Sequence, residues 1–291
     1  MQRLVRFSAL AAAAVTVGGL SVGAATAGST PGSTAVHPVI HGTGGLRPDI
    51  RLPRGNRPAV SSAGLPIQYS GNWSGYIALP KSGGASTFRA VSASYSVPSV
   101  NCGTTPTAFA YQWVGLDGDT NGTVEQDGVG SYCVSGSPTY FAWSEMYPAG
   151  VDVQFYLNAG DAVNSSVSYD KTTNDYTLSL TDVTSGQTFT TTQYCAPATC
   201  QRTSAEVITE GYPSGSYGGT SDFGAEHYDS ITVTGGSGNA NGLINSRWTT
   251  DESIAQGATD DVTTAPGSLD SSAAPAAPHS SAFEDIWYSE D

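Results

Sequence analysis

Short runs in which polar and apolar residues alternate are the feature that most constrains this chain. Such runs occur at 163–169, 176–180 and 231–233, and turn signals such as Asn174-Asp175 separate them. Alternation with period two puts successive side chains on opposite faces of a strand. No apolar stripe of helical spacing extends over 12 residues beyond the N-terminal segment. We therefore predict an all-β, antiparallel fold, either a sandwich or a barrel.

Two segments near the C-terminus have different compositions. Residues 256–281 are a stretch of Ser, Ala, Thr, Pro and Asp without a pattern, and we expect an exposed low-complexity loop there. The residues that follow, 283–288, are aromatic and apolar again. We interpret them as a last strand that returns to the sheet.

The first 27 residues have the features of a secretory signal peptide. Arg3 and Arg6 precede an apolar run at 9–17, and Ala25-Thr26-Ala27 fits the rule for cleavage after small residues. An uncleaved anchor is the alternative. No other stretch holds about 18 apolar residues, so we expect a secreted, extracellular protein that does not span a membrane.

Charge divides the rest of the chain at about residue 68. Six of the 11 basic residues and only one acidic residue lie before residue 69, whereas 24 acidic and 5 basic residues follow. Residues 28–68 are rich in Pro, Gly, Ser and Arg and are interpreted either as a flexible leader or as a basic propeptide lying across an acidic domain at 69–291. In the second case we expect acid to weaken the attraction. The acidic domain argues against nucleic acid as a partner.

Four cysteines lie in the acidic domain. An even number in a secreted chain indicates two disulfides, and neighbouring segments favour Cys102–Cys133 and Cys195–Cys200. A metal site is disfavoured because a CxxC spacing and nearby histidines are missing.

The usual signatures of hydrolases are weak in this sequence. Only His227 and His279 follow the leader, and no G-x-S-x-G motif occurs. The run 117–122 begins like a calcium loop, but Gly128 stands where a bidentate Glu is required. We interpret it as a Gly-rich turn and expect neither a metal nor a cofactor. Any catalysis would then depend on carboxylates, amides and aromatic residues.

Five blocks mix aromatic with polar residues, which suits a cleft better than a core. They are Asn72-Trp73-Ser74-Gly75-Tyr76, Gln112-Trp113-Val114-Gly115-Leu116-Asp117-Gly118-Asp119, Val124-Glu125-Gln126-Asp127-Gly128-Val129, Ala142-Trp143-Ser144-Glu145-Met146-Tyr147-Pro148 and Ala205-Glu206-Val207-Ile208-Thr209-Glu210-Gly211-Tyr212. Strand alternation puts Gln126 opposite to Glu125 and Asp127, and puts Glu206 and Glu210 on one face. In this order the blocks resemble the glutamic peptidase, or eqolisin, family from about residue 72 to 233.

The resemblance implies a fold and a set of site residues. Members are secreted, acid-active endopeptidases with a propeptide, and their fold is an antiparallel β-sandwich of two curved sheets like that of the concanavalin-type lectins. The catalytic pair would be Gln126 and Glu210, with Glu206 as the less favoured alternative to Glu210. The positions that match residues around the cleft are Trp113, Asp117, Trp143, Glu145 and Tyr147.

This pair suits amide hydrolysis without a metal or a covalent intermediate. Glu210 would take a proton from water and pass one to the leaving nitrogen, while the Gln126 amide would stabilise the oxyanion. A Glu near its ordinary pKa would serve in an acid medium. We expect a monomer that acts on proteins or peptides. A glycoside hydrolase with paired carboxylates and a non-catalytic lectin-like binding module are the alternatives.

Overall fold

The structure is a computed structural model that describes residues 46–211, 219–256, 262–270 and 280–289. All of them belong to one compact unit, Gly42–Asp291. The expected signal peptide, the first part of the leader and His279 lie outside the described residues. The described part of the chain contains no helix that is long and apolar enough to span a membrane.

Seventeen strands are formed by the described residues. They are β1 (Arg51–Leu52), β2 (Ile67–Ser70), β3 (Trp73–Leu79), β4 (Phe88–Ser96), β5 (Phe109–Leu116), β6 (Val124–Val134), β7 (Ser137–Tyr147), β8 (Asp152–Leu157), β9 (Ala162–Asp170), β10 (Asp175–Asp182), β11 (Thr188–Tyr194), β12 (Ala205–Glu210), β13 (Ala225–Gly235), β14 (Ala240–Asn241), β15 (Thr249–Gln256), β16 (Val262–Pro266) and β17 (Ser281–Trp287). The predicted all-β class is confirmed, and the last strand forms where it was expected.

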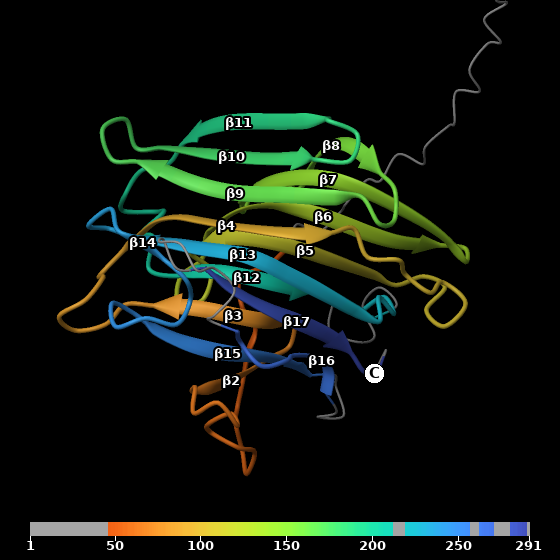
Figure 1. Cartoon of the computed structure of the whole chain (residues 1–291), viewed down its shortest axis with the longest axis horizontal. Helices are drawn as coiled ribbons and strands as arrows, with labels where there is room; N and C mark the ends of the chain where they lie inside the picture. The colour runs from red at the N-terminus through yellow and green to blue at the C-terminus, as the bar shows by residue number, and fades with distance from the viewer. Residues whose placement is uncertain (1–45, 212–218, 257–261, 271–279, 290–291) are drawn as a thin grey trace, which may run out of the picture. The chain divides into compact units, whose positions relative to one another are not determined.

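The strands form two curved layers of a β-sandwich (Figure 1). One layer runs β8-β7-β6-β5-β12-β3-β15-β2-β1, and the other runs β11-β10-β9-β4-β13. The layers are joined because β13 also pairs with β17, which reaches β15 through β16. The named strand pairs are antiparallel, with the exception of β2 and β15, which run parallel.

Alternation explains which strands occupy one layer or the other. β10 alternates strictly between half-buried and buried residues, as expected of a strand with one face in the core and one toward solvent. By contrast, β5 is buried along its whole length. One face of β5 packs on the interior of the sandwich, and its other face must therefore be covered as well. That second covered face is where the aromatic and acidic blocks of the sequence meet.

Two expectations about loops are wrong in part. The segment expected to be a loop at 256–281 contains β16, whose β-branched Val262, Thr263 and Thr264 fill the gap between β15 and β17. The leader is not a free linker over its described part, since β1 pairs with β2 and β2 begins at Ile67. A boundary at residue 69 would cut through β2.

Both disulfides have the pairing that the spacing favoured. Cys102 is bonded to Cys133 at the end of β6, and Cys195 is bonded to Cys200 in the segment before β12. The structure has no free cysteine among the residues it describes. Each bridge therefore anchors a connection beside a strand that carries a candidate site residue.

Acidic side chains are buried in the core even away from the candidate site. Asp285 in β17 is fully buried and accepts a hydrogen bond from the Ser74 hydroxyl at 2.7 Å. Burial raises the pKa of Asp285 to about 7. Burial likewise raises the pKa of Glu226 to about 8, although Glu226 accepts a hydrogen bond from the backbone N–H of Ser96. These groups fold most favourably in their neutral forms.

The protein is therefore expected to lose stability as the pH rises. A carboxyl whose pKa is higher in the folded state contributes its full stability below the unfolded value, about 4, and loses it as the pH passes through the folded value. Asp285→Asn mimics the neutral form and should reduce the loss between pH 4 and pH 8 by about 3 kcal/mol, or roughly 6–10 °C in Tm.

Thermal unfolding at the two pH values measures this effect. Glu284→Gln is the matched control, because Glu284 is the exposed neighbour on the same strand. An equal fall in Tm for Asp285→Asn and the native protein would contradict the assignment of the loss to this carboxyl.

Candidate active site

Gln126 lies near the start of β6, between Gly115 of β5 and Glu145 of β7. Its Nε2 atom donates a 2.6 Å hydrogen bond to Glu145 Oε2, and both side chains are buried. The neighbouring Asp127 points to the other face, where its Oδ2 accepts a hydrogen bond from the Ser179 backbone N–H. Strand alternation thus places Gln126 on the covered face and sends Asp127 into the interior of the sandwich.

Glu145 is held in a neutral state over a wide pH range. Burial raises the pKa of Glu145 to about 9, and the nearby Glu210 raises it further, against the lowering effects of Gln126 and a backbone hydrogen bond from Leu46. Gln126 Oε1 has no hydrogen-bond partner among the described residues. Because a neutral carboxyl can both donate and accept, the Glu145 side chain can bind either end of the Gln126 amide.

Glu210 ends β12 and is surrounded by donors. Its Oε1 accepts hydrogen bonds from Asn72 Nδ2 and from the Arg47 backbone N–H, both at 3.0 Å. Its Oε2 accepts a hydrogen bond from Trp73 Nε1 at 3.2 Å. Burial nevertheless raises the pKa of Glu210 to about 8. The expectation of an ordinary pKa is wrong for this state of the protein, because the leader residue Arg47 and the surrounding strands exclude water from the carboxyl.

Glu206 occupies a different position on the same face. Its register places it beside Gly115, which in turn lies beside Gln126. The Trp113 ring occupies the space over Gly115, since a Cβ atom there would lie only 2.7 Å from the ring. The indole therefore stands between Gln126 and Glu206. Glu210 contacts the Trp73 indole nitrogen and interacts electrostatically with Glu145, the partner of Gln126.

Aromatic rings form the wall of this site. Trp113 packs edge-on against Trp73 with ring centroids 5.0 Å apart, and Trp143 packs edge-on against Tyr111 at 5.3 Å. All four rings are buried, whereas Tyr147 at the end of β7 is half-buried. The rings provide an apolar, poorly hydrated environment, in which charge interactions are stronger than in water.

Asp117 joins two connections beside the candidate site. Its Oδ1 accepts hydrogen bonds from Asn121 Nδ2 and the Thr203 backbone N–H, and its Oδ2 accepts one from the Arg202 backbone N–H, all at 2.7 Å. These bonds join the Gly-rich turn after β5 to the segment before β12. The predicted contact of Asp117 with a substrate stays a prediction.

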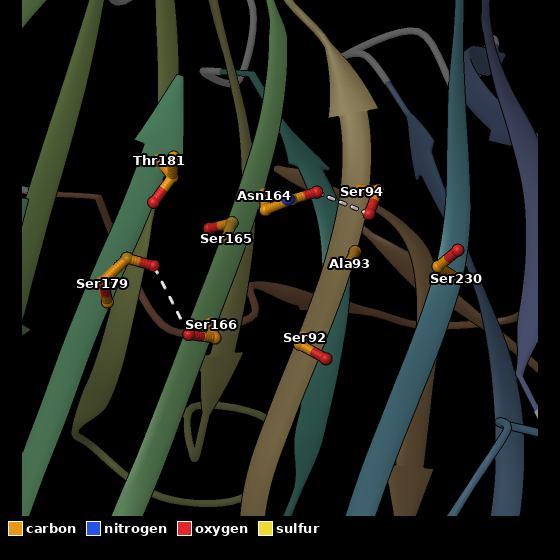
Figure 2. A pocket seen from close by; sticks show the side chains of 9 residues that line it. All are labelled: Ser92, Ala93, Ser94, Asn164, Ser165, Ser166, Ser179, Thr181 and Ser230. Carbon is orange, nitrogen blue, oxygen red and sulfur yellow. Dashed lines mark hydrogen bonds between the residues drawn. The ribbon is translucent and has the colours of Figure 1, made fainter. Parts of the chain in front are cut away.

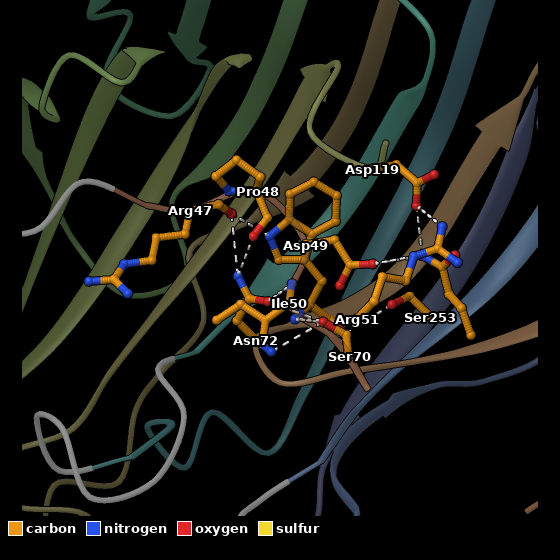
Figure 3. Close-up of polar contacts among 11 residues, drawn as sticks. Arg47, Pro48, Asp49, Ile50, Arg51, Ser70, Asn72, Asp119 and Ser253 are labelled. Carbon is orange, nitrogen blue, oxygen red and sulfur yellow. Dashed lines mark hydrogen bonds and ion pairs between the residues drawn. The ribbon is translucent and has the colours of Figure 1, made fainter. Parts of the chain in front are cut away.

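The leader lies directly on the candidate site, which the sequence did not specify. Leu46 is buried with 1% exposure, and the Arg47 carbonyl accepts a hydrogen bond from Trp73 Nε1 at 3.0 Å. Asn72 Oδ1 accepts a hydrogen bond from the Ile50 backbone N–H at 2.9 Å (Figure 3). The leader backbone thus forms hydrogen bonds with the side chains of Trp73 and Asn72, which also contact Glu210. Asn72 and Trp73 open the first sequence block, and this block was the sequence signal from which the docking position of the leader could have been predicted.

An ion-pair cluster holds the leader further along. Arg51 contacts Asp49 at 2.8 Å and Asp119 at 2.5 Å (Figure 3). Burial raises the pKa of Asp49 to about 6, and Asp251, which interacts with both Asp119 and Arg51, also has a pKa raised to about 6 by burial. The Arg51–Asp119 ion pair joins the basic leader to the acidic domain.

The leader's own contacts lower the pKa values of the carboxyls that they reach. The Arg47 backbone N–H lowers the pKa of Glu210, and the Arg51 guanidinium lowers those of Asp49 and Asp251, although burial raises all three overall. The expectation that acid loosens the leader stays a prediction.

A second hollow lies on the other sheet and has different chemistry. It has a volume of about 270 Å³ and is lined by Ser92, Ala93, Ser94, Asn164, Ser165, Ser166, Ser179, Thr181 and Ser230 (Figure 2). None of these lining side chains is a carboxyl, a histidine or an amine. The hollow lacks a proton donor or acceptor of suitable pKa, which leaves the face with Gln126 and Glu210 as the candidate active site.

The fold is an antiparallel β-sandwich, and one face of it carries buried carboxyl and carboxamide groups. The model of the Peptidase A4 family matches residues 71–272, and the chain belongs to this family of glutamic peptidases. Membership of this family implies peptide substrates. It therefore favours a peptidase over the alternatives of a glycoside hydrolase and a lectin-like binding module.

Solved structures share the fold. A scytalido-glutamic peptidase with a transition state analog inhibitor is 23% identical, with a TM-score of 0.59 over 75% of this chain and 98% of that chain. SCP-B, a member of the eqolisin family in a complex with the tripeptide Ala-Ile-His, is also 23% identical, with a TM-score of 0.56 and the same coverage. Comparison with curated proteins gave no match.

Proposed function

We propose that this glutamic peptidase is a secreted, acid-active endopeptidase in which Glu210 activates water and Gln126 stabilises the oxyanion. The observation that carries the proposal is the position of the Leu46–Arg47 peptide unit. Its nitrogen lies 3.0 Å from Glu210 Oε1, and the Leu46 backbone is hydrogen-bonded to Glu145, the partner of Gln126. A main chain therefore lies against Glu210 and against Glu145, the hydrogen-bond partner of Gln126.

Hydrolysis would proceed without a covalent intermediate. Ionised Glu210 accepts a proton from water as the water oxygen attacks the scissile carbonyl carbon. The Gln126 amide donates a hydrogen bond to the oxygen that becomes negative. Glu210 then gives its proton to the departing nitrogen. If the leader left the site, Glu210 would be exposed to water. Burial is the largest cause of the raised pKa of Glu210, so exposure would lower that pKa and allow Glu210 to act as a base at lower pH.

Glu145 is a positioning residue in this proposal. The Gln126 amide must present Nε2 to the oxyanion, although Nε2 donates to Glu145 in the described state. A neutral Glu145 can donate its proton to Gln126 Oε1 instead, and this leaves Nε2 free. The raised pKa of Glu145 keeps it neutral throughout the acid range. Ionisation of Glu145 should therefore lower activity only as the pH approaches about 9, since ionised Glu145 would hold Nε2 and withdraw it from the substrate.

The first experiment compares casein cleavage at pH 3 and pH 7. We expect the protein, after incubation in acid, to cleave casein at pH 3 and to show little cleavage at pH 7, as its membership of a family with acid-active peptidases implies. Serine and cysteine reagents should have no effect, and EDTA should have none either. Cleavage that requires a metal, or that is fastest at pH 7, would contradict the proposal.

A further inference from the structure

We propose that the outer edge of β2, together with Asp119 and Asp251, is a substrate-binding site that takes an extended peptide segment carrying an arginine or a lysine. The site is separate from the proposed catalytic pair. This inference rests on the proposed function and adds a substrate class to it. The favoured substrates are polypeptides with a basic residue at a fixed distance after the scissile bond.

β2 is bordered by β15 on one side and by the leader on the other. It runs parallel to β15, and it pairs with β1 of the leader through Arg51–Ser70 and Leu52–Tyr69. If the leader left, this side of β2 would present unpaired N–H and C=O groups. A strand edge of this kind binds an extended peptide through main-chain hydrogen bonds, and the sequence of that peptide matters little to these bonds.

Further hydrogen bonds continue this edge toward the catalytic pair. The Ile50 carbonyl accepts a bond from the Gly71 N–H at 2.8 Å, and the Ile50 N–H donates to Asn72 Oδ1 at 2.9 Å. The Asp49 N–H donates to the Gly118 carbonyl at 3.1 Å. On the leader's side, all of these bonds use main-chain atoms. A substrate segment of another sequence can therefore form them as well.

The contacts of Arg51 indicate which side chain the site selects. Its guanidinium lies 2.5 Å from Asp119 Oδ1 (Figure 3), and Asp251 of β15 interacts electrostatically with both groups. The Asp119 side chain has no exposure, and its Oδ2 has no hydrogen-bond partner among the described residues. Arg51 also contacts Asp49, but Asp49 belongs to the leader itself. A buried carboxylate is costly without a cation, so Asp119 and Asp251 favour a basic side chain in this place.

The proposed mechanism fixes where along a substrate the basic residue belongs. Glu210 gives its proton to the departing nitrogen, and the main-chain nitrogen 3.0 Å from Glu210 Oε1 is that of Arg47. A substrate that presents its departing nitrogen in this place has its fifth residue after the scissile bond in the place of Arg51. The distance along an extended chain is roughly 13 Å at about 3.3 Å per residue. The basic residue therefore lies well away from the bond that breaks.

The test uses the acid-incubated protein and a casein peptide that it cuts once. The peptide is synthesised with arginine or with citrulline, its uncharged analogue, at the fifth residue after the cut. We expect kcat/KM to be about 10-fold higher with arginine, because citrulline loses a charge-assisted hydrogen bond to a buried carboxyl. The same exchange at the first residue after the cut is the control and should change kcat/KM less than about 2-fold, since Arg47 is exposed. Equal values for the first pair overturn this inference alone, whereas no cleavage of casein overturns the proposed function.

Two enzyme variants identify the carboxyl that reads the basic residue. In Asp119→Asn, the ratio of kcat/KM between the arginine and citrulline peptides should fall from about 10 to less than about 2. Asp229→Asn makes the same change of charge at an exposed position of β13, in the other layer, and should keep the ratio. The ratio is measured within one enzyme, so a partial loss of folded protein does not alter it. An unchanged ratio in Asp119→Asn would overturn the inference.

Peptides with one N-methyl group test the main-chain part of the site on the native enzyme. A methyl group on the nitrogen of the fourth residue after the cut, in the place of Ile50, removes the bond to Asn72 Oδ1 and should lower kcat/KM about 3–10-fold. A methyl group on the second residue is the matched control and should change it less than about 2-fold, because the leader has Pro48 there and no N–H to donate. Equal effects at the two positions would overturn the path along β2.

Discussion

Glu210→Gln is expected to reduce kcat/KM on a peptide substrate at pH 4 by about 1,000-fold, within the 10²–10⁴ range of general acid–base catalysis. Glutamine has nearly the same shape and can still contact Asn72 and Trp73, but it can neither take a proton from water nor return one to the leaving nitrogen. The loss should therefore lie in kcat, with KM nearly unchanged. Steady-state kinetics on a peptide cleaved by the native enzyme measure both constants.

Glu206→Gln is the matched control for this variant. Glu206 lies on the same strand and the same face, and burial also raises its pKa well above the ordinary value. The Trp113 ring stands between it and Gln126, so we expect activity within about 3-fold of the native enzyme. An inactive Glu206→Gln enzyme together with an active Glu210→Gln enzyme would reverse the assignment of the catalytic carboxyl.

Gln126→Ala is expected to have the second largest effect, a fall in kcat of about 10²–10³-fold, as for loss of one oxyanion donor. The amide interacts mainly with the charge that develops during the reaction, so KM should change much less than kcat. Circular dichroism should show an intact fold, since the truncation removes one side chain from a strand held by pairing on both sides.

The half-buried amide of Gln154 provides the control for Gln126. It lies in β8 and contacts Ser144 and Asp152, away from Glu145 and Glu210. Gln154→Ala should keep full activity. If Gln126→Ala instead raised KM and left kcat unchanged, Gln126 would be a substrate-binding residue and the proposed oxyanion role would be wrong.

Strand alternation in the sequence was sufficient to predict an all-β, antiparallel sandwich or barrel, the family resemblance added the choice of a sandwich, and alternation also put Gln126 opposite to Asp127. Both predictions depend on local geometry, because the two faces of a strand follow directly from period two. The pairing of the cysteines was predictable for a similar reason, since each bridge joins neighbouring segments. The expectation for β16 failed because its short run of Val and Thr becomes a strand only between β15 and β17.

The site was less predictable wherever a role depends on distant contacts. Asp117 belongs to a motif of the cleft, yet its oxygens are occupied by a segment 85 and 86 residues away in the sequence. The pKa of Glu210 depends on burial that includes Arg47, which is 163 residues away. The leader carries no periodicity that could predict its path, because it is ordered by hydrogen bonds from Trp73 and Asn72 and not by a pattern of its own.

The leader is part of the same polypeptide as the site that it covers. A segment tethered in this way is present at an effective concentration on the order of millimolar, whatever the concentration of the protein in its surroundings. Release of the protein into a large volume would therefore not switch the enzyme on, as it would for an inhibitor on a separate chain. The covered state of the site is therefore the same at every concentration of the protein.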